Sequence, residues 1–256
     1  MQENVLEIKN LHVQFPIHIG TVRAVEDVSL NLRKGEVMGL VGESGCGKST
    51  LGFSILRLLR PPGKIAGGEI NYHGRDICRM HIKELLALRG RNISMIFQDP
   101  LTSLDPLYTI GEQFLETLRT HEKGIKKKIA LERAAEMLKS LGISPDRLHE
   151  YPHQMSGGMR QRVMIAMALS CNPQLLIADE PTTALDVKVQ KNIIQLIKKL
   201  RDKYGMGVLF ISHDLGVVAQ ISDEVLVMNN GKIVESGSVK QVLSSVFSQS
   251  RSIWGL

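Results

Sequence analysis

One glycine-rich stretch constrains this chain more than any other feature. It reads Gly42-Glu43-Ser44-Gly45-Cys46-Gly47-Lys48-Ser49-Thr50, which fits the phosphate-binding pattern G-x-x-x-x-G-K-[ST]. The glycines let the backbone curl tightly around a polyphosphate, because glycine accepts positive φ without a Cβ clash. In this pattern the lysine supplies a cation for the β- and γ-phosphates, and the serine hydroxyl suits Mg²⁺. The stretch predicts a nucleotide-binding site.

The sequence on either side fits the same site. Residues 36–41 form a short apolar run of strand type, and residues 50–60 carry leucine and isoleucine at helical spacing. A strand, a glycine loop and a helix in this order direct the helix N-terminus toward the phosphates, where its dipole adds to the attraction. An ordinary glycine turn is the alternative, and the Lys48-Ser49 pair in register disfavours it.

Composition limits the class of protein. A chain of 256 residues with 43% hydrophobic residues forms one large domain or two small ones with a sizeable core. No apolar run approaches the roughly 18 residues of a membrane helix, and residues 1–4 lack the pattern of a signal peptide, so we expect a cytosolic location. Cys46, Cys78 and Cys171 are too few and too far apart for a disulfide or metal-ligand framework.

The positive charge of the chain is spread widely. The net charge of +6 is compatible with nucleic acid, an anionic membrane surface or an acidic partner. The one cluster, Lys126-Lys127-Lys128, is typical of a solvated helix face, with a binding patch as the alternative. Aromatic residues make up only 4% of the chain, which leaves little surface for stacking single-stranded bases. We therefore expect no nucleic-acid partner.

Hydrophobic periodicity divides the chain into alternating strands and helices with one long helical interruption. We expect a strand at 5–15, a strand pair over 22–32, a loop at 61–68 before a strand at 69–72, and a buried strand at 93–97. Helical spacing runs from 110 to about 141, and no strand pattern returns until 174. The fold class predicted is α/β: a P-loop NTPase core with a mostly parallel sheet, an antiparallel β subdomain and an inserted helical subdomain.

Two acids follow a second apolar run. Leu175-Leu176-Ile177-Ala178 leads directly into Asp179 and Glu180, and ligands of open α/β sheets lie at the carboxyl ends of strands. Asp179 is placed to hold Mg²⁺ or its water shell, and Glu180 to orient and deprotonate an attacking water. A strand-end acidic pair that caps the next helix is the alternative, which the glycine loop upstream makes less favourable.

Three more residues are candidates for the same edge. Gln98 and His213 each follow a predicted buried strand, so an amide near Mg²⁺ and an imidazole near the γ-phosphate are expected there. A lone histidine after a strand is usually structural, and only its expected position favours a function. Phe15 is the only aromatic residue before the glycine loop. It could stack on an adenine ring or simply be a buried strand residue.

A second phosphate-binding surface is predicted on the helical part of the chain. Ser156 can cap the helix that follows it, and Gly157 and Gly158 expose backbone N–H groups at the positive end of that helix. A capped helix without a ligand is the simpler alternative.

Taken together, these stretches resemble the ABC ATPases. Met155-Ser156-Gly157-Gly158-Met159 is similar to their signature motif LSGGQ, 42–49 to their Walker A motif and 175–180 to their Walker B motif, while Gln98, Ala184-Leu185-Asp186 and His213 resemble the Q-loop, D-loop and H-loop. The resemblance runs from about residue 5 to 240. It implies one ABC nucleotide-binding domain over 1–256, with a RecA-like core and β subdomain at 1–98 and 172–240, a helical subdomain at 99–171 and a tail at 241–256.

A closer resemblance is to the D-type ATPase subunits of dipeptide, oligopeptide and nickel importers. It rests on residues 97–106, 151–162 and 178–187. It implies two ATPase subunits that clamp two ATP molecules, each glycine loop working with the partner's signature motif. The implied partners are a second ABC ATPase of the F type, two permease subunits and an extracytoplasmic solute-binding protein, with the chain peripheral on the cytoplasmic face of the membrane.

The sequence departs from this pattern in two places. Met159 replaces the usual signature glutamine, which could make the two composite ATP sites unequal. The chain ends at Leu256 without a cysteine after Cys171, whereas peptide-carrying relatives often continue into a cysteine-rich segment. We therefore expect no iron–sulfur cluster, with truncation as an alternative explanation of the length.

The function expected is ATP binding and hydrolysis that powers a membrane importer for peptides or for nickel or metal chelates. The roles implied are catalysis by Glu180, His213 and Gln98 and contact of Leu101 to Gln113 with a membrane subunit. One alternative is a soluble ABC ATPase acting on nucleic acid or ribosomes, and another is a regulatory module that binds nucleotide without hydrolysis. The solute itself is not specified by these motifs.

Overall fold

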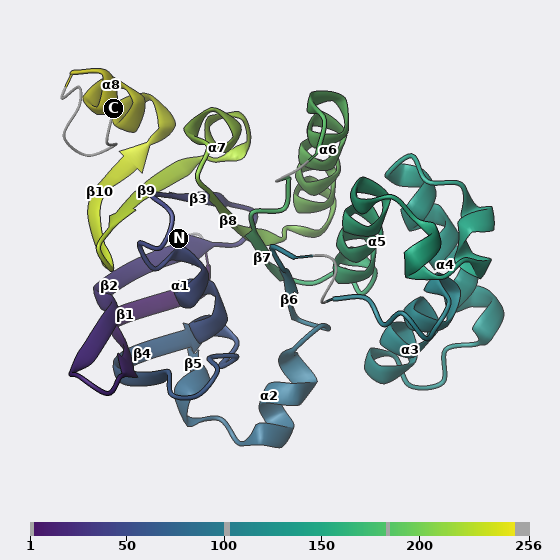
Figure 1. Cartoon of the computed structure of the whole chain (residues 1–256), viewed down its shortest axis with the longest axis horizontal. Coiled ribbons are helices and arrows are strands. Elements are labelled where there is room, and N and C mark those ends of the chain that lie inside the picture. Colours follow the sequence, from purple (N-terminus) through teal and green to yellow (C-terminus); the bar gives the residue numbers. More distant parts are fainter. Residues whose placement is uncertain (1–2, 100–102, 183–184, 249–256) are drawn as a thin grey trace.

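A computed structural model describes residues 3–99, 103–182 and 185–248, and in this part of the chain the strands form two sheets (Figure 1). The smaller sheet is antiparallel, in the order β2-β1-β4-β5. Its strands are β1 (Asn4–Pro16), β2 (Thr21–Arg33), β4 (Lys64–Tyr72) and β5 (Arg75–Asp76). Its apolar side chains alternate with exposed ones along β1, so one face of the sheet is buried.

Two expectations for this sheet are wrong. Residues 22–32 form one strand rather than a pair, because β2 runs along β1 from Pro16↔Thr21 to Asn4↔Arg33. Irregularities in the pairing, with Asp27 at a φ of 57°, break the alternation that a regular strand would show. The strand predicted at 69–72 begins at Lys64 instead, inside the predicted loop, because β4 pairs with β1 as far as Gln14↔Lys64.

The larger sheet has the order β10-β9-β3-β8-β7-β6. Its strands are β3 (Val37–Val41), β6 (Ile93–Ile96), β7 (Leu175–Asp179), β8 (Gly207–Ser212), β9 (Glu224–Asn229) and β10 (Lys232–Ser238). All neighbours are parallel except β10, which forms an antiparallel hairpin with β9. Every residue of β3, β6, β7 and β8 is buried, as expected for parallel strands covered on both faces. The carboxyl ends of these four strands therefore lie along one edge.

Helices cover the two faces of this sheet. Helix α1 (Lys48–Ile55) packs between the two sheets, where Leu51 and Ile55 join one hydrophobic core. The predicted helix extended to residue 60, but Arg57 has a φ of 51° and the Leu58 N–H bonds to the Phe53 carbonyl, which ends the helix. The opposite face is covered by α5 (Gly157–Leu169), α6 (Val187–Tyr204) and α7 (Leu215–Ile221), whose side chains form a second core.

The chain between β6 and β7 is helical. It holds α3 (Ile110–His121), α4 (Lys127–Ser140), α5 and two short 3₁₀ helices, Pro145–His149 and Pro152–Gln154. We call α3, α4 and α5 the helical block, which extends to the right of the sheets in Figure 1. Thr109 and Glu112 form a reciprocal capping box at the start of α3. The exact subdomain boundaries at 98/99, 171/172 and 240/241 stay a prediction.

Three shorter elements complete the fold. They are the 3₁₀ helix Ile77–Arg79, α2 (Ile82–Leu88) and α8 (Val239–Ser248). Among the described residues, no helix combines the length and apolar character that crossing a bilayer requires.

Candidate functional site

The glycine loop joins β3 to α1, as the sequence predicts. A Cβ on Gly42 would lie 2.1 Å from the Met228 carbonyl oxygen, so no larger residue fits there without a shift of the backbone. Gly47 has a φ of 112° and caps α1, and a Cβ on it would lie 2.2 Å from the Ala24 carbonyl oxygen. Both glycines are therefore required by backbone conformation and close packing. The neighbours Glu43, Ser44, Gly45 and Thr50 complete the loop and the first turn of α1.

Lys48 lies against its own loop. Its side chain is buried, with the residue 5% exposed, and Nζ donates to the carbonyl oxygens of Gly42 and Glu43 at 2.7 Å each. The Cys46 Sγ lies 3.7 Å from the same nitrogen. The ammonium group is thus held at the loop by neutral acceptors, which an anionic phosphate oxygen can replace with a stronger charge-assisted bond.

Ser49 and Asp179 meet across the start of α1 and the end of β7. The Ser49 hydroxyl donates to Asp179 Oδ1 at 3.0 Å, and Asp179 is 1% exposed. The pKa of Asp179 is raised to about 6 as the net result of four influences. Burial raises it most and the charge of Glu180 also raises it, while the Ser49 hydrogen bond and the charge of Lys48 lower it. A divalent cation at this pair would stabilise the ionised carboxylate that burial disfavours.

Glu180 lies between two of the predicted residues. Its Oε1 is 3.2 Å from Nδ1 of His213, and its Oε2 accepts a hydrogen bond from Nε2 of Gln98 at 3.2 Å. The residues come from the ends of β7, β8 and β6, so the parallel sheet brings them together as the sequence predicts. Glu180 has a φ of 47°, an unusual conformation that costs roughly 1–3 kcal/mol and requires support from surrounding contacts.

Phe15 is half-buried at the end of β1, beside Gly63. It lines a groove of about 810 Å³ together with Ser49, Thr50, Gln98 and other residues, including Asp179 and Phe97. The aromatic ring thus shares one groove with the side chains expected around the phosphates. Its contact with an adenine ring stays a prediction.

The signature stretch lies elsewhere. Ser156 caps α5, with Oγ accepting from the Met159 N–H at 3.3 Å, and Gly157 is exposed at the first turn. Gly158 packs toward Leu185. Figure 1 shows α5 and α1 apart, with β6 and β7 between them. The helix that begins at Gly157 is therefore separated from α1 by two strands of the larger sheet in this view.

Asp186 acts as a helix cap in this chain. Its Oδ1 accepts the Val189 N–H at 2.9 Å and caps α6. Ala184, the first residue of the predicted D-loop, lies outside the described residues.

One contact was not predicted from the sequence. The buried Gln161 side chain donates from Nε2 to the Pro181 carbonyl oxygen at 2.8 Å, immediately after Glu180. Helical periodicity places Gln161 on the buried side of α5, but no sequence signal indicates which backbone atom it meets.

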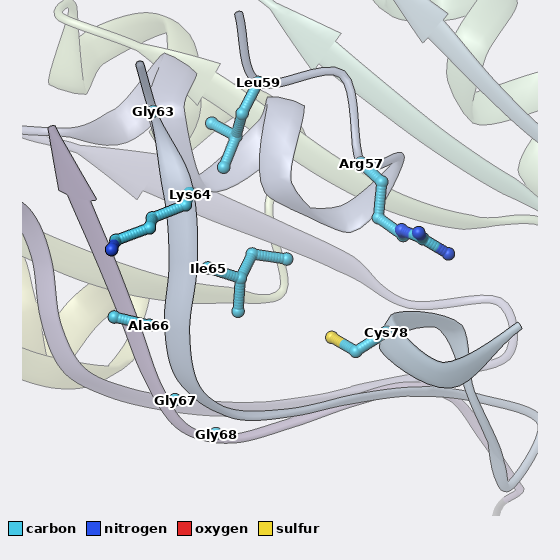
Figure 2. Close-up of a pocket in the computed structure, with 9 residues that line it drawn as sticks. All are labelled: Arg57, Leu59, Gly63, Lys64, Ile65, Ala66, Gly67, Gly68 and Cys78. Carbon is cyan, nitrogen blue, oxygen red and sulfur yellow. The ribbon is translucent and has the colours of Figure 1, made fainter. Parts of the chain in front are cut away.

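A second cavity is separate from this site. It has a volume of about 460 Å³ and lies beside the end of α1 and the strand β4, with Arg57, Lys64 and Cys78 among the side chains around it (Figure 2). It includes no predicted site residue.

Comparison with known proteins agrees with this geometry. A family model described as ABC transporter matches residues 25–183. The dipeptide transport ATP-binding protein DppD of Bacillus subtilis is 52% identical over 244 residues, which cover 94% of this chain and 72% of the relative. The oligopeptide transport ATP-binding protein OppD of Salmonella typhimurium is 49% identical over 240 residues, which cover 93% of this chain and 71% of the relative.

A solved structure gives the same result for the fold. The dimeric ATP-binding cassette MJ0796, in a post-hydrolysis state bound to ADP and Pi, superposes with a TM-score of 0.85 at 31% identity and covers 91% of this chain and 98% of its own. The predicted α/β fold of a P-loop NTPase core is thereby confirmed. The chain therefore belongs to the ABC transporter family, as an ATP-binding cassette that hydrolyses ATP.

Proposed function

We propose that this cassette drives a membrane importer for peptides. The observation that carries the proposal is the convergence of Lys48, the Ser49–Asp179 pair and Glu180 at one sheet edge. The named relatives with about 50% identity are ATP-binding proteins of dipeptide and oligopeptide transport, which supports peptides as the solute class. They give no support to nickel as the solute or to the nucleic-acid alternative.

ATP and Mg²⁺ bind at the glycine loop and at the strand ends beside it. Backbone N–H groups of 42–50 surround the phosphates of ATP, and Lys48 exchanges its carbonyl partners for β- and γ-phosphate oxygens. Phe15 stacks on the adenine from the end of β1. Ser49, Asp179 and Gln98 fit Mg²⁺, because they offer a hydroxyl, a buried carboxylate and an amide oxygen at one edge. The ion, when bound, neutralises charge on the phosphate oxygens.

Glu180 is the residue that activates water. A carboxylate can accept the proton of an attacking water and hold that water in line with the γ-phosphate. His213 and Gln98 fix its two oxygens, so the side chain is oriented by the ends of two neighbouring strands. His213 also contacts the γ-phosphate, and its 56% exposed side chain is free enough to make that contact.

A second ATPase subunit completes the site. Ser156, Gly157 and Gly158 contact the ATP of the partner subunit, because they present helix N–H groups at a surface away from their own glycine loop. Asp186 lies at the same interface. The MJ0796 cassette is described as a dimer, which supports this arrangement. For this chain we propose an F-type ABC subunit as the partner.

The membrane side of the cassette is proposed to be the surface of the segment Leu101 to Gln113, which follows Gln98 along the chain. Residues 101 and 102 of this segment lie outside the described part. A helix of the permease seated there would be coupled through Gln98 to the γ-phosphate. The chain would then be peripheral on the cytoplasmic face of the membrane, with two permease subunits and an extracytoplasmic binding protein.

Co-purification tests this assembly. Tagged chain is recovered from gently solubilised membranes, and the proteins bound to it are identified by mass spectrometry. Two permeases, a second ABC ATPase and a solute-binding protein support the proposal, and the purified binding protein can then be tested with dipeptides and oligopeptides. Recovery of ribosomes or nucleic acid without membrane subunits would contradict it.

A further inference from the structure

A buried amide of the helical block reaches the backbone beside the catalytic glutamate. Gln161 lies on α5, five residues after Ser156, and is 3% exposed. Its Nε2 donates to the Pro181 carbonyl oxygen at 2.8 Å. A buried amide has few possible partners, so this bond fixes the distance between α5 and the segment after β7.

The residue next to this bond is strained. Glu180 combines a φ of 47° with a following proline, and the residue before a proline normally prefers an extended conformation. Such a backbone persists only where contacts on both sides determine it. On the amino side the Glu180 N–H donates to the Ile211 carbonyl at 2.9 Å. On the carboxyl side Pro181 has no N–H, so its carbonyl is the polar backbone atom that can be held there.

The conformation of this backbone decides where the carboxylate points. Glu180 is directed toward His213 and Gln98 at 3.2 Å from each, and its side chain is 13% exposed. A relaxed backbone with negative φ would turn the side chain to another direction, because φ sets the orientation of the Cα–Cβ bond relative to β7. A displacement of about 1 Å is enough to reduce a positioned reaction by roughly 100-fold.

We propose that Gln161 is a positioning residue for hydrolysis: it holds the Pro181 carbonyl and thereby keeps Glu180 aimed at the attacking water. Because Gln161 belongs to the helix that starts at the signature stretch, the same bond connects that helix to the base of its own chain. The inference rests on Glu180 acting as the base, as proposed above.

The test is a comparison of matched substitutions in the complete transporter. Gln161→Met keeps the length of the side chain and removes the donor. Gln174→Met is the control, since it removes the oxygen that accepts the Tyr72 hydroxyl in a hydrogen bond of 2.7 Å. This bond involves neither the glycine loop nor Glu180. ATPase rates are measured per nucleotide-binding site, together with KM for ATP, nucleotide affinity and melting temperature.

We expect Gln161→Met to lower kcat by roughly 10- to 100-fold. KM and nucleotide affinity should stay within about twofold, because the phosphate contacts of Lys48 and the glycine loop are untouched. Gln174→Met should keep the parent kcat. If Gln161→Met does not fold, Gln161→Leu serves instead, since leucine is apolar, favours a helix and cannot donate to a carbonyl.

Two outcomes would overturn the inference. One is a folded Gln161 variant whose kcat equals that of the parent. The other is a fall in total ATPase rate that matches a fall in the number of nucleotide-binding sites, so that the rate per site is unchanged. Glu180→Gln is measured in parallel to separate the two proposals. If Glu180→Gln still hydrolyses ATP, the assignment of the base is wrong, whereas an inactive Glu180→Gln with a fully active Gln161→Met rejects the role of Gln161 alone.

Discussion

Two regions of the molecule present backbone N–H groups of the kind that bind phosphate, and they differ in how far their own chain encloses them. The glycine loop is surrounded by its own chain, with Lys48 buried and the Ser49 hydroxyl bound to Asp179. The signature stretch at the start of α5 is exposed at Gly157, and its Gly158 carbonyl oxygen accepts a hydrogen bond from Nε of Arg162 at 3.1 Å. On the proposal above, the first region binds a nucleotide within one chain, whereas the second binds one only against another subunit.

The largest effect is expected at the first region. Glu180→Gln should reduce ATP hydrolysis by about 10²- to 10⁴-fold, because glutamine keeps the shape but cannot accept the proton of water. ATP binding should be retained, since the phosphate contacts are unchanged. Steady-state turnover and equilibrium nucleotide binding on the same preparation check this. Unchanged turnover would reject Glu180 as the base.

Two glycine substitutions compare the regions directly. Gly42→Ala should destroy nucleotide binding by the isolated chain, because its Cβ would lie 2.1 Å from the Met228 carbonyl oxygen. In Gly157→Ala the new Cβ would have no atom of the described residues within 4 Å, so folding and nucleotide binding of the isolated chain should be normal. Its assembled transporter should nevertheless lose about 10-fold or more in ATPase rate, because the methyl group obstructs the partner's ATP.

Two results for Gly157→Ala would contradict the proposed difference between the glycine loop and the signature stretch. Equal ATPase rates of parent and variant in the assembled transporter would show that this surface does not meet a nucleotide. Reduced nucleotide binding by the isolated variant would show that it acts within its own chain.

A smaller effect is expected at the adenine end of the first region. Phe15→Ala should weaken ATP binding by roughly 3- to 10-fold, since an aromatic contact contributes about 0.5–1.5 kcal/mol beyond buried area. Phe15→Leu, which keeps an apolar side chain on β1, separates stacking from loss of packing. Nucleotide titrations check both variants, and equal affinities for parent and leucine variant would argue against stacking.

The smallest effect is expected at the amino-terminal ends of the strands of the larger sheet, where Glu36 precedes β3. Burial raises the pKa of Glu36, with the charges of Glu224 and Asp223 acting in the same direction. The folded state therefore binds this proton more tightly than the unfolded state. Its contribution to stability is full below the ordinary glutamate pKa of about 4.3 and is lost as the pH rises through the raised value.

Glu36→Gln should remove the loss of stability that ionisation of Glu36 causes. The free energy of unfolding of the variant relative to the parent should therefore rise with pH through that window and become constant toward neutral pH. Urea unfolding at several pH values measures it, and a difference that is independent of pH would contradict the expectation. Nucleotide binding should not change, because Glu36 lies at the amino-terminal end of β3 and the glycine loop lies at its carboxyl end.

The sequence predicts the site better than it predicts the smaller sheet. Glu180, His213 and Gln98 could be expected to meet, because parallel neighbours end at a common edge and each residue follows its strand directly. The course of β2 could not, because the irregular pairing around Asp27 depends on β1, a partner not adjacent in sequence at that point. The carbonyl partners of Lys48 and Gln161 could not be predicted either, since side-chain-to-backbone bonds depend on packing and leave no periodic pattern in the sequence.

The helical block leaves the core after β6 and returns at β7, and these two strands are paired neighbours. Departure and return therefore lie close together, which is the condition under which an inserted unit can be exchanged or lengthened without disturbing its host. A cassette of this design could be engineered for a new permease by changing α3 and α4, while α5 with its signature stretch and Gln161 is kept.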